Sequence, residues 1–106
     1  MENRVNIILV CGIPGVGKTH FSNNLKKNFK SVSVISFDDN FDPVIDLKVY
    51  KEKRKEFFFN FVEKVNEGIE FIILDDNFYF KSMRKPFYKF AKSQMNMSYL
   101  EVMLKS

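Results

Sequence analysis

A glycine-rich segment between an apolar run and a helical pattern carries the clearest chemistry in this sequence. Residues 12–19 read GIPGVGKT and fit the pattern G-x-x-x-x-G-K-[ST] at every fixed position. Glycines at this spacing let backbone N–H groups approach phosphate oxygens, and the N-terminus of the following helix attracts the same anion. In this pattern Lys18 reaches the β- and γ-phosphates of a nucleotide, and the Thr19 hydroxyl binds Mg²⁺. The predicted nucleotide-binding residues are Gly12, Ile13, Pro14, Gly15, Val16, Gly17, Lys18 and Thr19. The alternative, a simple glycine-rich turn, leaves the Lys-Thr pair unexplained.

Two acidic residues, Asp75 and Asp76, follow the apolar run of residues 71–74. A carboxylate at the end of such a strand holds Mg²⁺ beside the threonine of the phosphate-binding loop. Thr19, Asp75 and Asp76 are therefore the predicted metal-binding residues. The alternative is an aspartate that caps or turns the chain at a strand end. We favour the metal role for one member of the pair because it directly follows a strand.

A second acidic pair, Asp38 and Asp39, follows the apolar segment of residues 31–37. A carboxylate at this place can accept the proton of an attacking hydroxyl and orient that hydroxyl toward the γ-phosphate. This chemistry suits a kinase that acts on an alcohol, whereas a hydrolysing enzyme needs only to position water. The sequence does not separate Asp38 from Asp39 as the base. The alternative is an Asx-type turn into the loop that contains Pro43.

Other polar and aromatic side chains have weaker claims to a role. Arg84 lies just past Asp75 and Asp76, where a cation reaches a phosphate or the transition-state charge; the alternative is a surface arginine. His20 has no partner at a recognisable spacing, which favours a helix-surface position. The Phe57–Phe59 run is interpreted as core and not as a base-stacking platform. The predicted catalytic residues are Asp38, Asp39, Lys18 and Arg84.

The elements that must position these residues alternate between strands and helices. The predicted strands are residues 5–11, 31–37, 71–74 and 99–104, and the predicted helices follow the glycine-rich segment, cover residues 47–66 and begin with Ser82 as a cap. Gly68 follows the second helix where a C-cap glycine belongs, and Pro86 is expected to kink the third helix or delay its start. This order predicts an α/β fold, a P-loop NTPase-type three-layer sandwich with a parallel sheet. Because the carboxyl ends of parallel strands form the ligand-binding edge, Lys18 and both acidic pairs are expected to converge on one crevice.

Length and composition limit the broad class of protein. The 106 residues suffice for one domain (1–106), and 45% hydrophobic with 28% charged residues is a globular composition. The net charge of +4 is compatible with a polyanionic partner, although a solvated lysine-rich surface is the commoner explanation. The single Cys11 has no intrachain disulfide partner, and its place in an apolar strand predicts an inert buried thiol. No apolar run reaches the length of a membrane span, and no signal peptide is recognised, so a cytoplasmic setting is expected.

Three segments of the chain resemble the L-seryl-tRNA(Sec) kinase family, also called O-phosphoseryl-tRNA(Sec) kinases. They are GIPGVGKTHFSNNL at residues 12–25, VISFDD at residues 34–39 and ILDDNFYFKSMRKPFYKFAK at residues 73–92. The third segment is the most specific, because many kinases share the first. The segment YKEKRKEFFFNF at residues 50–61 also looks like a helix of that family, so the resemblance spans residues 7–104.

The resemblance implies an ATP- and Mg²⁺-dependent transfer of phosphate to the seryl hydroxyl of serine esterified to selenocysteine tRNA. The phosphoseryl product would then feed selenocysteine synthesis. Seryl-tRNA(Sec) is accordingly the expected partner, together with ATP and Mg²⁺. By similarity, an aspartate of the 38–39 pair is the general base, one of the 75–76 pair lies near metal and substrate, and Arg84 belongs to an S-M-R motif.

The chain departs from that family in two respects. Family members typically continue after the fourth strand with a lid, a further strand and a separate tRNA-gripping domain, so this chain is expected to correspond to the N-terminal part, with a sheet incomplete at its C-terminus. Some relatives carry an arginine three residues beyond the catalytic aspartate, where this chain has Phe41 or Asp42. Two other functions remain open: a P-loop kinase of a small-metabolite hydroxyl, and a non-catalytic nucleotide-binding or tRNA-associated P-loop module, of which an elongator-associated protein would be a relative.

Overall fold

Four strands pair into one parallel sheet in the order β2-β3-β1-β4. The structure is a computed structural model, and it describes residues 4–12, 17–37, 46–78 and 80–104. In chain order the elements are β1 (Val5–Cys11), α1 (Lys18–Asn28), β2 (Val32–Ser36), α2 (Leu47–Asn66), β3 (Phe71–Asp76), α3 (Lys81–Lys92) and β4 (Met97–Met103). The predicted α/β class with a parallel sheet is confirmed.

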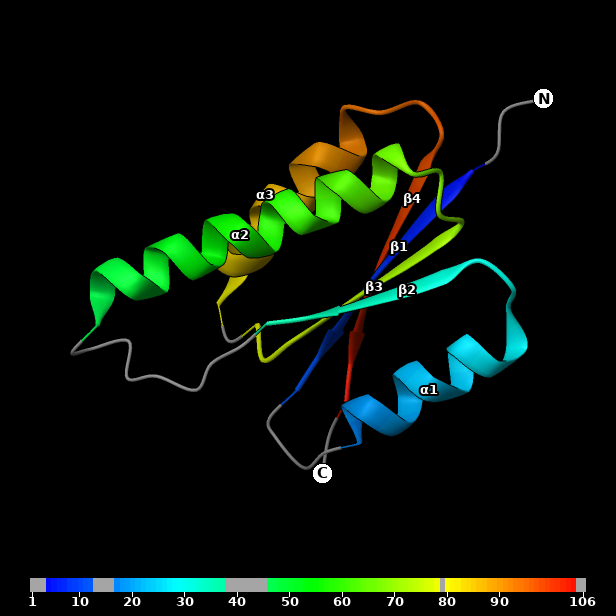
Figure 1. The fold of residues 1–106 in the computed structure, drawn as a ribbon, viewed down its shortest axis with the longest axis horizontal. Coiled ribbons are helices and arrows are strands. Elements are labelled where there is room, and N and C mark those ends of the chain that lie inside the picture. Colours follow the sequence, from blue (N-terminus) through cyan, green and yellow to red (C-terminus); the bar gives the residue numbers. More distant parts are fainter. Residues whose placement is uncertain (1–3, 13–16, 38–45, 79, 105–106) are drawn as a thin grey trace.

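Helices cover both faces of this sheet and make three layers (Figure 1). Helix α1 lies on one face, and α2 and α3 lie together on the other. Successive side chains of a strand point to opposite faces, so the neighbours Leu9 and Val10 of β1 belong to different apolar clusters. Because both faces of β1 and β3 are covered, these two strands are apolar almost throughout. The exceptions are Asn6 of β1 and the acidic residues at the end of β3.

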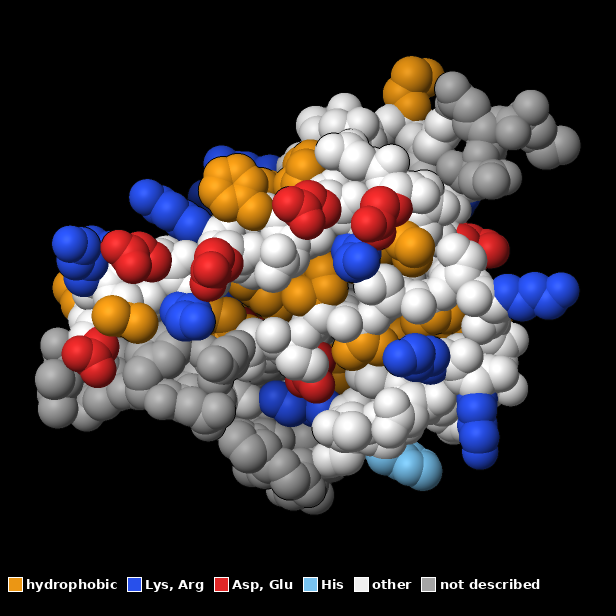
Figure 2. All heavy atoms as spheres, in the orientation of Figure 1, with side chains coloured by type: hydrophobic (Ala, Val, Ile, Leu, Met, Phe, Trp, Pro, Cys, Tyr) orange, Lys and Arg blue, Asp and Glu red, His pale blue; other side chains and the backbone are white. Residues whose placement is uncertain are grey.

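Phenylalanine rings fill the layer between the sheet and the pair α2 and α3. Phe61 is fully buried, and its ring centroid lies 5.3 Å from that of Phe87 and 5.2 Å from that of Phe90. Phe57 is also buried, which confirms the interpretation of that part of the Phe57–Phe59 run as core. Phe59 points outward and is 65% exposed, because consecutive helical positions lie about 100° apart. Around α2 the surface carries acidic and basic side chains next to one another (Figure 2).

The predicted ends of β2 and β4 differ from the structure by one or two residues, and two further boundaries were wrong for different reasons. The third strand does not end at Leu74 but continues through Asp76, because Cys11 of β1 still pairs with that residue. Helix α3 is not capped by Ser82; it begins at Lys81 after Phe80, which has extended backbone and no side-chain cap bond. Pro86 neither delays the start of α3 nor ends it, since the helix runs on to Lys92 with Phe87 buried against the sheet. Burial of this apolar face outweighs the backbone hydrogen bond that proline removes.

The described parts of the chain contain no helix that is both long and apolar enough to cross a membrane.

Candidate functional site

The glycine-rich segment leads directly into helix α1. Gly12 follows β1, and Gly17 has φ 101°, a left-handed conformation that residues with a Cβ rarely adopt. This backbone explains the last glycine of the pattern, and α1 begins at the next residue, Lys18. The predicted binding residues Ile13, Pro14, Gly15 and Val16 lie outside the described residues. Thr19 is exposed in the first turn of α1.

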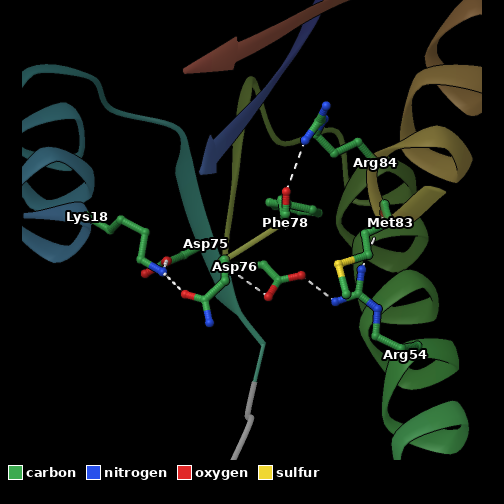
Figure 3. A network of polar contacts seen from close by, with 8 residues as sticks. Lys18, Arg54, Asp75, Asp76, Phe78, Met83 and Arg84 are labelled. Carbon is green, nitrogen blue, oxygen red and sulfur yellow. Dashed lines mark hydrogen bonds and ion pairs between the residues drawn. The ribbon is translucent and has the colours of Figure 1, made fainter. Parts of the chain in front are cut away.

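The Lys18 side chain reaches across to the end of β3 (Figure 3). Its Nζ donates a hydrogen bond to Asn77 Oδ1 at 2.8 Å and lies 3.6 Å from Asp75 Oδ1. The Lys18 and Asp75 side chains are only 12% and 15% exposed, so solvent screens their attraction less than at an open surface. The structure therefore brings the predicted phosphate-binding lysine and the predicted metal aspartate together at the carboxyl edge of the sheet.

Asp75 and Asp76 point to opposite faces of the sheet. Asp75 pairs opposite Val10, on the face that α1 covers, whereas Asp76 pairs opposite Cys11, on the face that α2 and α3 cover. Asp76 is 8% exposed and forms an ion pair with Arg54 of α2. Only Asp75 lies beside Lys18, so the structure separates two residues that the sequence treats alike.

Oxygen donors at this edge fit a hard cation such as Mg²⁺. Asp75 supplies a carboxylate and Asn77 an amide oxygen, and the Thr19 hydroxyl follows Lys18 in the same helical turn. The described residues contain no group of three or more His, Cys, Asp or Glu that could hold a metal alone. Mg²⁺ commonly binds only one or two carboxylates and completes its shell with water and substrate phosphates.

Arg54 is the functional candidate that the sequence reasoning missed. Its guanidinium lies over the Phe37 ring at 4.6 Å from the centroid, and the rings of Phe57 and Phe78 follow at 5.4 and 5.8 Å. One nitrogen pairs with Asp76, and Nη2 donates to the Met83 carbonyl at 3.3 Å. The sequence places Arg54 on the apolar face of α2, and a cation at such a position was the signal for a buried partner.

Arg84 is held by the turn after β3 and by β4. Its Nη1 donates to the Phe78 carbonyl at 3.0 Å, and its Nε lies 3.0 Å from Glu101 Oε1. The side chain is 13% exposed, so the alternative of a surface arginine is wrong. Phe78 has φ 49°, which is unusual for a bulky residue, and the bond from Arg84 helps to hold that turn. A phosphate contact of Arg84 stays a prediction.

The predicted bases Asp38 and Asp39 lie outside the described residues. The chain immediately before them is placed next to Asp75. Ser36 pairs with Asp75 across β2 and β3, and the Phe37 backbone N–H donates to the Asp75 carbonyl at 2.9 Å. The end of β2 is therefore at the same edge of the sheet as Lys18 and Asp75, as the parallel arrangement predicts.

Burial keeps the Cys11 thiol and the Tyr99 hydroxyl protonated. Cys11 is 1% exposed, and burial raises the pKa of its thiol to about 11. The thiol is therefore protonated at neutral pH, which agrees with the prediction of an inert cysteine. Burial, together with the neighbouring Glu101 carboxylate, raises the pKa of Tyr99 well above its ordinary value. His20 is exposed on α1, as the surface interpretation predicts.

Comparisons with known proteins support the P-loop kinase-like class. A chain of the solved structure described as "Structure of Pnkp1/Rnl/Hen1 complex" superposes with a TM-score of 0.63 over 100% of this chain, at 13% sequence identity. At that identity the likeness concerns the fold alone. The match covers 38% of the other chain, so this chain spans well under half the length of that protein. The model of one protein family matches residues 5–105, almost the whole sequence. The chain therefore belongs to the family described as "Chromatin associated protein KTI12".

Proposed function

We propose that this protein binds ATP with Mg²⁺ and transfers the γ-phosphate to a hydroxyl group, with seryl-tRNA(Sec) as the acceptor. The observation that carries the proposal is the placement of Lys18. It stands at the start of α1, directly after Gly17, with its ammonium between Asp75 at the end of β3 and Asn77 just after that strand. The ammonium has three N–H donors and gives one of them to Asn77, so the other two can bind the phosphates of a nucleotide while Asn77 keeps Lys18 in place.

Within this proposal Asp75 and Thr19 hold the metal. When the phosphates take the free donors of Lys18, the attraction between Lys18 and Asp75, 3.6 Å apart, is weakened, and the Asp75 carboxylate can then bind the metal ion. Bound Mg²⁺ would neutralise charge on the phosphate oxygens. Asp76 is already matched with Arg54 on the other face of the sheet, so it is the weaker of the two predicted metal residues.

Support for the acceptor comes from the sequence. The segment of residues 73–92 resembles the corresponding stretch of seryl-tRNA(Sec) kinases, and it contains both Asp75 and Arg84. In this proposal Asp38 or Asp39 accepts the proton of the seryl hydroxyl, and Arg84 contributes positive charge at the phosphate. A hydroxyl acceptor is what distinguishes this reaction from simple hydrolysis.

The acceptor is tested by phosphoryl transfer from ATP labelled in the γ-phosphate. The full-length protein is expected to label seryl-tRNA(Sec) and to leave uncharged tRNA(Sec) unlabelled, because the seryl hydroxyl is the nucleophile. The double variant Asp38→Ala/Asp39→Ala should lose transfer by about 100- to 10,000-fold, the range of a general base, while it still binds ATP. Labelling of small alcohols in place of the charged tRNA would rule out this acceptor.

A second experiment separates the roles of the two aspartates at the end of β3. Asp75→Asn is expected to weaken the Mg²⁺-dependent part of ATP binding by about 10- to 100-fold, a range seen when groups at a metal site are removed. Asp76→Asn keeps the size of the side chain but leaves Arg54 without its carboxylate, so it should lower thermal stability and leave the ratio of affinities with and without Mg²⁺ unchanged. Calorimetric ATP titrations with and without Mg²⁺ measure both effects. The reverse pattern would assign the metal to Asp76.

Family membership favours one second candidate, a nucleotide-binding module that performs no transfer. The matching family is described by an association with chromatin and not by a reaction. Such a module would bind ATP through Lys18, and a partner protein would recognise the ATP-bound form. It predicts that ATP binds normally while no acceptor is labelled, and that the double change at Asp38 and Asp39 has no transfer to remove.

A further inference from the structure

We infer that Arg54 is a positioning residue for the nucleotide site, which acts through Asp76 and Asn77 on the phosphate-binding Lys18. The inference rests on the proposed binding of ATP and goes further, because it makes helix α2 part of a site formed by α1 and β3. Hydrogen bonds and an ion pair connect the residues in sequence: Arg54 to Asp76, Asp76 to Asn77, and Asn77 to Lys18 (Figure 3).

Aromatic rings and hydrogen bonds hold the Arg54 guanidinium in place. Three phenylalanine rings surround it, with Phe37 the nearest at 4.6 Å from the ring centroid. Its two terminal nitrogens bond to groups on different elements, the Asp76 carboxylate of β3 and the Met83 carbonyl of α3. A planar guanidinium makes such a pair of bonds with little loss of freedom, whereas a lysine ammonium has no comparable fork. The side chain is 17% exposed, so competition from water is limited.

Asp76 connects Arg54 to the next residue along the chain, Asn77. Its Oδ2 pairs with Arg54, and its Oδ1 accepts the backbone N–H of Asn77 at 2.7 Å. With both oxygens engaged, the carboxylate fixes the backbone of Asn77 relative to α2. The Asn77 side chain then presents Oδ1 to Lys18 Nζ at 2.8 Å. The place of Lys18 before nucleotide binding therefore depends on an arginine on the opposite face of the sheet.

A purely structural role of Arg54 is the alternative. A buried ion pair among aromatic rings also ties α2, β3 and α3 together, and removing one partner of such a pair destabilises a protein. Stability alone does not separate the two roles. A positioning role also predicts that Arg54 and Asn77 affect ATP affinity through the same series of contacts. The losses of affinity caused by replacing each of them are therefore not additive.

The test measures ATP affinity of the full-length protein by calorimetry. Arg54→Met keeps an unbranched side chain among the phenylalanine rings and removes the charge, and it is expected to weaken ATP binding about tenfold, within the range of measured coupling energies. Lys55→Met is the matched control, because it removes one positive charge from the exposed neighbour on the same helix. That control should bind ATP as the wild type does. Circular dichroism checks that each variant is folded.

A double-mutant cycle gives the decisive result. Asn77→Ala should weaken ATP binding, and Arg54→Met added to it should weaken binding no further. If Arg54→Met does not fold, Arg54→Lys replaces it, with an expected loss of about threefold because one ammonium does not make both bonds. Wild-type affinity in the folded Arg54 variant, or fully additive losses in the cycle, would overturn the inference and leave the proposed ATP binding intact. Absence of ATP binding by the wild type would overturn both.

Discussion

Replacement of Lys18 by alanine is expected to weaken ATP binding by about 100-fold or more. The estimate corresponds to the loss of about two charge-assisted hydrogen bonds to phosphate oxygens. The lysine is the one cation that the structure places both at the start of α1 and beside Asp75, among the residues it describes. ATP at a concentration that raises the melting temperature of the wild type should leave that of Lys18→Ala unchanged.

The same substitution on the same helix provides the control for Lys18. Lys26→Ala removes an exposed lysine from the last turn of α1 and should bind ATP as the wild type does. Without nucleotide, Lys18→Ala should remain folded, because it loses one hydrogen bond and one ion pair that together contribute about 1–2 kcal/mol. Tight ATP binding by Lys18→Ala would show that the glycine-rich segment is not the nucleotide site.

Replacement of Phe61 by alanine should lower the free energy of unfolding by about 3–5 kcal/mol, the range for removing a large buried aromatic side chain. Phe61 is fully buried and meets the rings of Phe58, Phe87 and Phe90 at centroid distances of 5.9, 5.3 and 5.2 Å. The substitution would leave a cavity and remove ring contacts between α2 and α3. Since small domains are stable by about 5–15 kcal/mol, this variant should lose a large part of its stability.

Phe59, two positions earlier on the same helix, is the exposed control for the buried Phe61. It is 65% exposed, so Phe59→Ala should change the free energy of unfolding by no more than about 0.5 kcal/mol. Urea titrations of both variants, followed by circular dichroism, measure the difference. Equal midpoints for the two variants would contradict the packing of α2 described above.

The fold could be predicted where hydrophobic pattern and chain breaks agree. Helix α2 has the predicted limits, residues 47–66, because an aromatic stripe at helical spacing lies between a sequence segment that contains proline and Gly68. Strand β1 also has its predicted limits. The end of β3 could not be predicted in the same way, since the apolar pattern stops at Leu74 while the backbone pairing continues to Asp76. Polar side chains interrupt the hydrophobic pattern of a sequence, but the backbone hydrogen bonds of the strand can continue past them.

The sequence predicts the part of the candidate site that lies at the carboxyl ends of the parallel strands. Ends of such strands lie at one edge, which is why the proximity of Lys18 and Asp75 was expected. The link from Arg54 to Asp76 joins residues 22 apart, and no periodic pattern relates them. The same holds for Arg84 and Glu101, which meet only because α3 packs beside β4. Contacts of this kind depend on tertiary packing, to which local sequence rules do not extend.

The two aspartates at the end of β3 also determine how that strand aligns with its neighbours. Ile72, Ile73 and Leu74 are all fully buried, so hydrophobicity alone does not decide which of them faces α1. A slip by one residue exchanges the two faces. In one direction Lys18 would then meet leucine, and in the other Arg54 would meet the neutral Asn77 in place of a carboxylate. Either slip leaves a largely buried cation without an anion, so the ion pairs of Lys18 and Arg54 select a single register for β3.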